Sequence, residues 1–100
     1  MRINMKQQNS EDGWWQFVEL CTGLKNKNNL DELFTLLLTY DEREDIAGRY
    51  LIIRELLKGE LTQREMADQL GVSIAKITRG SNFLKTTGES FKKLFKSKMT

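Results

Sequence analysis

Residues 61–85 predict two short helices joined by a sharp turn, and this stretch restricts the possible folds of the chain. Its sequence is LTQREMADQLGVSIAKITRGSNFLK. Thr62 can cap the first helix, and Glu65 follows three residues later at the capping-box spacing. Gly71 supplies the positive φ angle that ends this helix. A cap, a short helix, a glycine and a second helix are the features of a helix-turn-helix, which we place at about residues 62–84.

Both helices of this stretch have an apolar side and a polar side. The apolar positions expected to face inward are Met66, Leu70, Ile74 and Ile77. After Ser73, which is placed to cap the second helix, the outer face carries short polar groups and two cations: Ala75, Lys76, Thr78, Arg79, Ser81 and Asn82. Such groups suit base edges and phosphates. The stretch therefore favours DNA binding, while a helical module that packs on another protein is the alternative.

The composition favours an all-α protein. The 100 residues include no proline and are long enough for one domain. Helical periodicity recurs throughout, and strand-like alternation does not. The charge is unevenly distributed along the chain. From Lys76 onward there are seven basic residues and one acidic residue, Glu89, a net charge of +6 in a chain whose net charge is +2. An acidic body with a basic end indicates a face suited to a polyanion.

Several classes of function find no support in the sequence. There is no histidine, which removes the usual general base and metal ligand. Cys21 is the single cysteine, so no disulfide forms within the chain, and we expect it to be buried. No apolar run is long enough to span a bilayer, and the N-terminal residues lack an apolar signal core. We therefore expect a cytoplasmic protein that is not an enzyme, has no metal site and does not contact membranes.

The remaining helices are predicted from caps and apolar spacing. Residues 1–10 are expected to form a flexible arm, and residues 11–100 a single helical domain. The first helix should begin at Glu11, and Asn29 is placed to cap the second. Later helices are expected from about Tyr40 to Lys58, closed by Gly59, and from Glu89 with Phe91, Leu94 and Phe95 facing inward.

The second helix is apolar on nearly every side. From Leu33 to Leu38 only Thr35 interrupts the apolar residues. A helix of this kind must be covered all around, and a chain of 100 residues has little with which to cover it. We therefore expect a closely packed homodimer.

Three segments resemble the bacterial tryptophan repressor family. They are LLLTYDERED at residues 36–45, IIRELLKGELTQRE at 52–65 and ITRGSNFLK at 77–85. The resemblance extends over about residues 14–85. It implies a six-helix, all-α fold, an intertwined homodimer, and one helix-turn-helix per subunit that binds double-stranded DNA.

The resemblance also implies a site for L-tryptophan as corepressor, with no further cofactor. Arg49 and Arg79 would flank the indole ring, and a guanidinium would bind the carboxylate. Gly80 would let the ring approach the backbone. The carbonyl groups of Leu36, Leu38 and Thr39 from the other subunit would accept hydrogen bonds from the ammonium group.

The function implied is tryptophan-dependent repression through a palindromic operator, which would block transcription initiation at genes of tryptophan metabolism. The residues expected at DNA are Gln63, Arg64, Ser73, Ile74, Ala75, Lys76, Thr78, Ser81 and Lys85. The chain departs from the family's best-known pattern at Phe83, where that pattern has a serine that helps hold the ammonium group. It also has Ala67 in place of a lysine and Lys76 in place of a threonine. A regulator of the same fold with a different effector is therefore an alternative.

Overall fold

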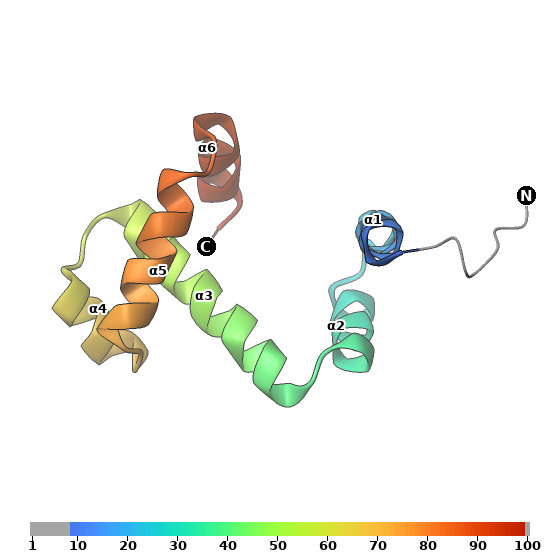
Figure 1. Cartoon of the computed structure of the whole chain (residues 1–100), viewed down its shortest axis with the longest axis horizontal. Helices are drawn as coiled ribbons and strands as arrows, with labels where there is room; N and C mark the ends of the chain where they lie inside the picture. Colours follow the sequence, from blue (N-terminus) through green and yellow to red (C-terminus); the bar gives the residue numbers. More distant parts are fainter. Residues whose placement is uncertain (1–8, 100) are drawn as a thin grey trace, which may run out of the picture. The chain divides into compact units, whose positions relative to one another are not determined.

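Capping residues and glycines set most of the helix ends in the computed structural model, which describes residues 9–99 (Figure 1). Within that range the secondary structure is entirely helical, which confirms the all-α prediction. The six helices are α1 (Ser10–Gly23), α2 (Lys27–Leu37), α3 (Tyr40–Lys58), α4 (Gln63–Leu70), α5 (Ile74–Lys85) and α6 (Glu89–Lys98).

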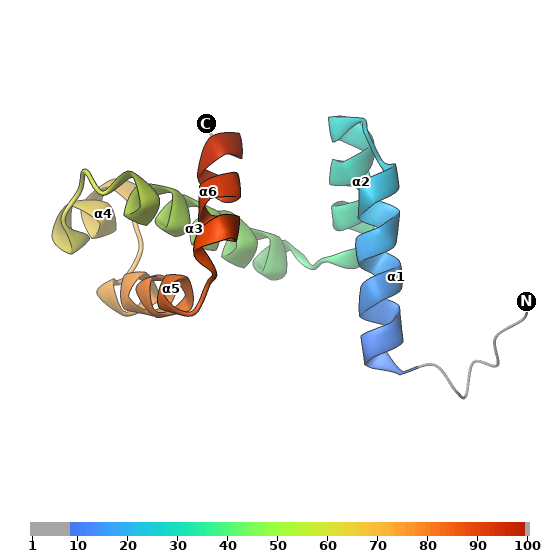
Figure 2. The same cartoon turned by 90° about the horizontal axis from the view of Figure 1, so that it is seen from above.

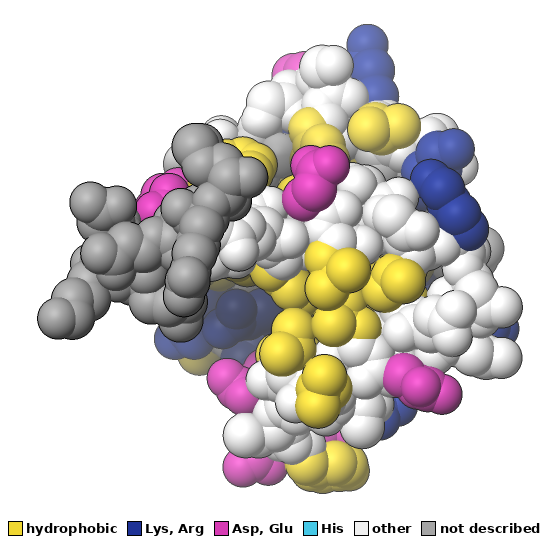
Figure 3. Space-filling model, turned by 90° about the vertical axis from the view of Figure 1, so that its right-hand side faces the viewer, with side chains coloured by type: hydrophobic (Ala, Val, Ile, Leu, Met, Phe, Trp, Pro, Cys, Tyr) yellow, Lys and Arg dark blue, Asp and Glu magenta, His cyan; other side chains and the backbone are white. Residues whose placement is uncertain are grey.

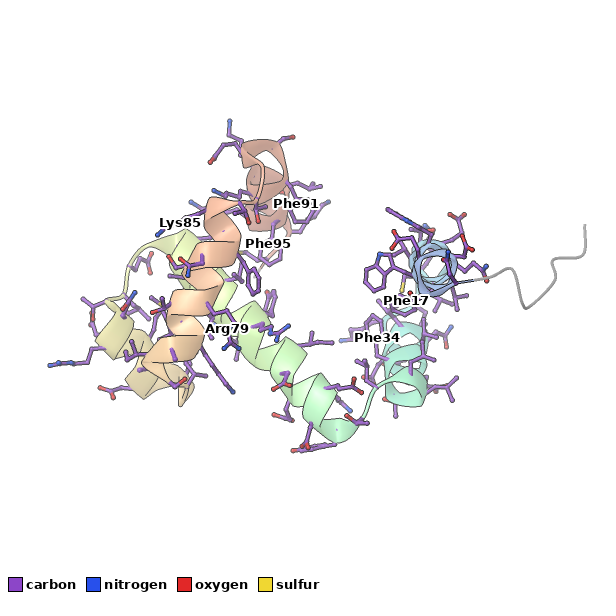
Figure 4. The ribbon with its side chains drawn as sticks, viewed as in Figure 1. Phe17, Phe34, Arg79, Lys85, Phe91 and Phe95 are labelled. Carbon is purple, nitrogen blue, oxygen red and sulfur yellow. The ribbon has the colours of Figure 1, made fainter. Side chains whose placement is uncertain are left out.

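The contacts within the chain divide it into two units, with the boundary between Thr39 and Tyr40. In the first unit α1 lies alongside α2, as Figures 1 and 2 both show. Phe17 on α1 and Phe34 on α2 lie close together (Figure 4), with their ring centroids 6.1 Å apart. The ring centroids of Trp14 and Phe17 are 5.7 Å apart. Phe17 thus packs α1 against Phe34 of α2.

The start of α2 differs from its prediction. Asn26, not Asn29, is the capping residue: its side-chain oxygen accepts hydrogen bonds from the backbone N–H groups of Asn28 at 2.8 Å and Asn29 at 3.2 Å. All three asparagines in this segment are competent caps. Because Asn26 caps the helix, Asn29 lies within its first turn.

Residues 1–8 of the predicted N-terminal arm lie outside the described residues. Asn9 forms a capping box with Asp12, in which the Asp12 N–H donates to Asn9 at 2.9 Å and the Asn9 N–H donates to Asp12 at 3.3 Å. The first helix therefore begins at Ser10, one residue earlier than predicted.

The second unit is built on α3, the longest helix described. Helices α4 and α5 pack against α3 and against each other. Three buried side chains form the centre of this packing: Ile52 of α3, Met66 of α4 and Ile77 of α5. Helix α6 joins the unit through Phe95, whose ring lies 6.0 Å from that of Tyr50 on α3. Gly59 ends α3 with a φ angle of 67°, as predicted.

Much apolar surface is exposed in the single chain. Figure 3 shows hydrophobic side chains gathered at the surface. Leu36 is 80% exposed and Trp15 is 60% exposed. Phe91 and Leu94 were predicted to face inward, and each is more than half exposed because α6 has few neighbours within the chain. Cys21 is half-buried, not buried.

Among residues 9–99, none of the helices combines the length and apolar character needed to cross a bilayer.

Candidate functional site

The helix-turn-helix forms from local hydrogen bonds that its sequence specifies. The Glu65 N–H donates to the Thr62 hydroxyl at 3.1 Å, and the Thr62 N–H donates to the Glu65 carboxylate at 2.9 Å. Gly71 ends α4 in the left-handed region with a φ angle of 65°. Ser73 then caps α5 by accepting a hydrogen bond from the Lys76 N–H at 3.2 Å. These contacts confirm the predicted caps and turn.

The residues expected at DNA lie on the surface of this unit. Eight of the nine are exposed and Ser81 is half-buried: Gln63, Arg64, Ser73, Ile74, Ala75, Lys76, Thr78, Ser81 and Lys85. The prediction that Ile74 faces inward is wrong, because its side chain is 45% exposed. Ile74 is the first residue of α5, and the packing against α3 and α4 is made one turn later by the fully buried Ile77. The outer face of α5 therefore begins with an apolar residue.

A cleft with a volume of about 740 Å³ lies beside these residues in the second unit. One wall is α3 and the other is α5, with the turn between α4 and α5 completing the lining. The lining residues are Glu44, Asp45, Ala47, Gly48, Arg49, Leu51, Ile52, Ile53, Leu70, Gly71, Val72, Lys76, Arg79, Gly80 and Phe83.

Three of the residues expected to bind the corepressor line this cleft. Arg49 comes from α3, and Arg79 and Gly80 come from α5. Both arginines are exposed, and Figure 4 shows Arg79 projecting from α5 on the side of α3. Two guanidinium groups on opposite walls can stack on a flat aromatic ligand and pair with a carboxylate.

Gly80 is buried and is needed for packing within the chain. A Cβ atom at this position would lie 2.8 Å from Cγ2 of Ile52 and 3.5 Å from Cδ1 of Leu56. The space that a side chain would occupy is therefore filled by α3 residues. Gly80 permits the close crossing of α5 over α3 on which the cleft is built.

Phe83 lies one turn after Arg79 on α5 and also lines the cleft. Its side chain is 54% exposed. A phenyl ring has no hydrogen-bond acceptor for an ammonium group, but it offers an apolar face to an aromatic ligand.

Leu36, Leu38 and Thr39, the residues expected to contribute carbonyl groups from a second subunit, lie at the end of α2 and in the link that follows it. The Leu38 N–H donates to the Phe34 carbonyl at 2.8 Å, as the C-cap of α2. The role of the three carbonyl groups in ligand binding stays a prediction.

The cleft includes residues that the sequence analysis missed. Glu44, Asp45, Ile52 and Ile53 share the cleft-facing side of α3 with Arg49. Asp45, Ile52 and Ile53 are three or four residues from Arg49, the separation of neighbours on one helical face, so their spacing alone predicts that they share its side of α3. Glu44 is five residues from Arg49, and its place in the cleft required the structure. The two carboxylates place negative charge in the same cleft as the arginines.

Two carboxylates of this unit have pKa values shifted downward. The hydrogen bond from the Thr62 backbone N–H lowers the pKa of Glu65, and the Thr62 hydroxyl adds to this. A hydrogen bond from Arg54, at 2.8 Å, lowers the pKa of Glu55, and Lys58 contributes in the same direction against the opposing effect of burial. Glu65 belongs to the capping box of α4, Glu55 pairs with residues of its own helix, and neither carboxylate lines the cleft. The described residues contain no cluster of three potential metal ligands.

Comparison with known proteins assigns the chain to a family. The family described as Trp repressor protein matches residues 12–99. A Trp operon repressor homolog of Chlamydia trachomatis is 50% identical over 95 residues, which cover 95% of this chain and all of the relative. Homologs of the same name from Chlamydia caviae and Vibrio vulnificus are each 48% identical, covering 93% and 88% of this chain and 92% and 86% of their own lengths. The helix-turn-helix, the adjoining cleft and these matches agree: the chain belongs to the Trp repressor protein family.

Proposed function

We propose that this protein is a tryptophan-responsive transcriptional repressor that acts as a homodimer. With L-tryptophan bound, it binds a palindromic operator and blocks transcription initiation of genes for tryptophan metabolism. Membership of the Trp repressor protein family makes transcriptional repression the class of function. The observation that carries the proposal is the position of Arg49 and Arg79 on two walls of one cleft, one of which is the exposed second helix of the helix-turn-helix.

In the proposed mechanism, a ligand in the cleft sets the orientation of α5 relative to α3. An indole ring between the two arginines would contact α3 on one side and α5 on the other, so the ligand would favour one orientation of α5 relative to α3. A ligand shifts DNA affinity only by its preference for the conformation that binds DNA. Coupling of this kind typically amounts to about 1–3 kcal/mol, or roughly 5- to 150-fold in affinity.

The DNA contacts are proposed for the exposed residues of α4 and α5. Gln63 and Arg64 at the start of α4 would contact the backbone or a base edge, and Lys85 at the end of α5 would contact phosphate. The residues proposed to face the major groove are Ser73, Ile74, Ala75, Lys76, Thr78 and Ser81. In a two-fold dimer, the half-sites would lie about one helical turn apart.

The second subunit would complete the cleft. Leu36, Leu38 and Thr39 of the partner subunit would accept hydrogen bonds from the ammonium group of tryptophan through their carbonyl oxygens. The exposed apolar residues of α2, with Leu36 80% exposed, support the dimer, since a surface of this kind needs cover.

Operator binding with and without L-tryptophan tests this proposal. Gel-shift titrations with duplexes selected from a random pool should give tighter binding when tryptophan is present, and affinity should fall as salt rises. Equal affinity in both conditions would exclude tryptophan as the effector. Absence of any salt-sensitive DNA binding would instead favour a protein-interaction module.

Phe83 supports a second candidate, a repressor of the same fold that responds to another aromatic effector. Its exposed phenyl ring offers an apolar surface and no acceptor in the cleft. Calorimetry with L-tryptophan, indole and indole carboxylates separates the candidates. Heat with an indole carboxylate and none with L-tryptophan would favour the second.

A further inference from the structure

Lys76 occupies the first turn of the exposed helix α5. It is the third residue of the helix, and the hydrogen bond from its N–H to the Ser73 hydroxyl, 3.2 Å long, anchors its backbone. Its side chain is exposed. The N-terminal residues of a recognition helix are those that reach base edges in the major groove. Lys76 is thus the cation nearest the N-terminus of α5, and the cap at Ser73 fixes its backbone.

The ammonium group of Lys76 makes no ion pair within residues 9–99. By contrast, Lys58 pairs with Glu55 at 3.6 Å and Lys92 pairs with Glu89 at 3.1 Å. Helix α5 carries no carboxylate of its own. Binding to DNA therefore breaks no ion pair of Lys76, and all three of its donor hydrogens are available to acceptors on the DNA.

Two further cations of the helix-turn-helix, Arg64 and Lys85, lie farther from the start of α5. Arg64 is the second residue of α4, and Lys85 is the last residue of α5. Figure 4 shows Lys85 at the end of α5 that leads into α6. The first helix of such a motif crosses the DNA backbone, which suits Arg64 to phosphate. Lys76 has a different setting, because its neighbours Ile74 and Ala75 are exposed and lack polar side-chain groups.

These neighbours favour a base contact over a phosphate contact. Ala75 is small enough to let the backbone of α5 approach the floor of the groove. The exposed part of Ile74 suits the methyl group of thymine. A lysine that follows two such residues is placed to reach O6 and N7 of guanine, the acceptor pair that lysine and arginine recognise in the major groove.

On the basis of the proposed function, we propose that Lys76 is a specificity-determining residue that donates hydrogen bonds to a guanine in each operator half-site. Lys76 specifies one base pair per half-site, whereas Lys85 contacts the phosphate backbone without regard to sequence.

The first part of the test selects operators from a random pool. The full chain, with L-tryptophan present, is used unmodified and as the Lys76→Thr, Lys76→Gln and Lys85→Gln variants. We expect the unmodified protein and Lys85→Gln to enrich guanine at one symmetry-related position. Both Lys76 variants should lose that preference and keep the others. Lys76 is exposed, so neither substitution should disturb the packing of the chain. Retention of the other base preferences shows that each variant is folded.

The second part measures affinity on the selected operator and on a duplex with that guanine replaced by adenine. The unmodified protein should bind the changed duplex about 5- to 150-fold more weakly. For Lys76→Thr the two duplexes should bind within about twofold of each other. Lys85→Gln should weaken binding to both duplexes equally. It should also reduce the slope of log affinity against log salt concentration by about one.

Three outcomes would overturn the inference. The first is a uniform loss of affinity in Lys76→Thr with its base preferences unchanged, which identifies a phosphate contact. The second is a loss of tryptophan affinity in Lys76→Thr without DNA, which assigns this cleft-lining residue to the ligand. The third, absence of sequence-specific DNA binding by the unmodified protein, would overturn the proposed function together with the inference.

Discussion

Gly80 of α5 and Ile52 of α3 are in such close contact that a Cβ atom on Gly80 would lie 2.8 Å from Cγ2 of Ile52. Ile52 is 3% exposed, and its Cγ2 methyl is attached directly to Cβ, so this group has little room to move. The crossing of the two helices therefore depends on the absence of a side chain at residue 80.

Gly80→Ala should destabilise the protein by about 1–3 kcal/mol, the usual cost of overpacking a buried site. The clash outweighs the gain of up to about 1 kcal/mol that alanine gives over glycine inside a helix. Urea unfolding followed by circular dichroism measures the difference. Gly48→Ala on α3 is the matched control, because a Cβ atom there meets nothing within 4 Å. Equal stability of Gly80→Ala and Gly48→Ala would contradict the packing described here.

Arg79→Ala should abolish the dependence of operator binding on tryptophan. The guanidinium is proposed to hold the ligand, so its removal should leave DNA affinity at the level of the ligand-free protein. Gel shifts with and without L-tryptophan measure this. Lys85→Ala serves as control and should weaken binding in both conditions while keeping the tryptophan response. A full response in Arg79→Ala would remove this residue from the ligand site.

Phe83→Ser should raise the affinity for L-tryptophan. A hydroxyl at this cleft-lining position offers an acceptor to the ammonium group, and a hydrogen bond to a charged group contributes about 1.5–3 kcal/mol, or roughly 10- to 150-fold in Kd. Calorimetry gives the affinity, with Phe83→Leu as the control that shortens the side chain without adding an acceptor. Unchanged tryptophan affinity in Phe83→Ser would show that residue 83 does not face the ammonium group.

Stability should fall with acid below about pH 4.5 in a way that depends on Glu65. The hydrogen bond from the Thr62 N–H lowers the folded-state pKa of Glu65 below its ordinary value of 4.5. The stabilisation is complete above that ordinary value and is lost as the pH falls through the lower folded pKa.

Glu65→Gln keeps a hydrogen-bond acceptor and removes the titration, so its stability should vary less with pH in this range. Urea unfolding at a series of pH values measures the effect. Glu55→Gln should also flatten the profile, because Arg54 and Lys58 lower the pKa of Glu55. A Glu65→Gln profile that matches that of the unmodified protein would contradict the assignment.

Leu36→Asp should prevent dimer formation. Leu36 is 80% exposed in the single chain, and a carboxylate at an apolar interface would be buried without a partner. Sedimentation analysis should report a dimer for the unmodified protein and for Leu36→Met, and a smaller or unfolded species for Leu36→Asp. A dimer of undiminished stability in Leu36→Asp would place the interface elsewhere.

The local features of the fold were predictable from sequence. Thr62 with Glu65, and Gly71 with its positive φ angle, act through neighbours a few residues away, so their spacing sufficed. Asn26 and Asn29 are equally competent caps, and the sequence alone did not distinguish them. The exposure of Ile74 also escaped prediction, because helical periodicity does not reveal where the contact with another helix begins.

The candidate site was predictable only in part. The resemblance placed Arg49 and Arg79 in one site, and both line one cleft. Ile52 and Gly80 are 28 positions apart in the sequence, and their contact depends on how α5 crosses α3. No spacing rule relates residues so far apart, so the packing role of Gly80 required the structure.

Ile52 belongs both to the buried core and to the lining of the cleft, whereas Phe83 on the same lining is 54% exposed. Substitutions at Ile52 or Gly80 must therefore preserve folding before they can alter ligand choice. Phe83 is free of that constraint. A substitution at Phe83 can consequently change which effector the cleft accepts, while the packing of Ile52 against residue 80 is kept.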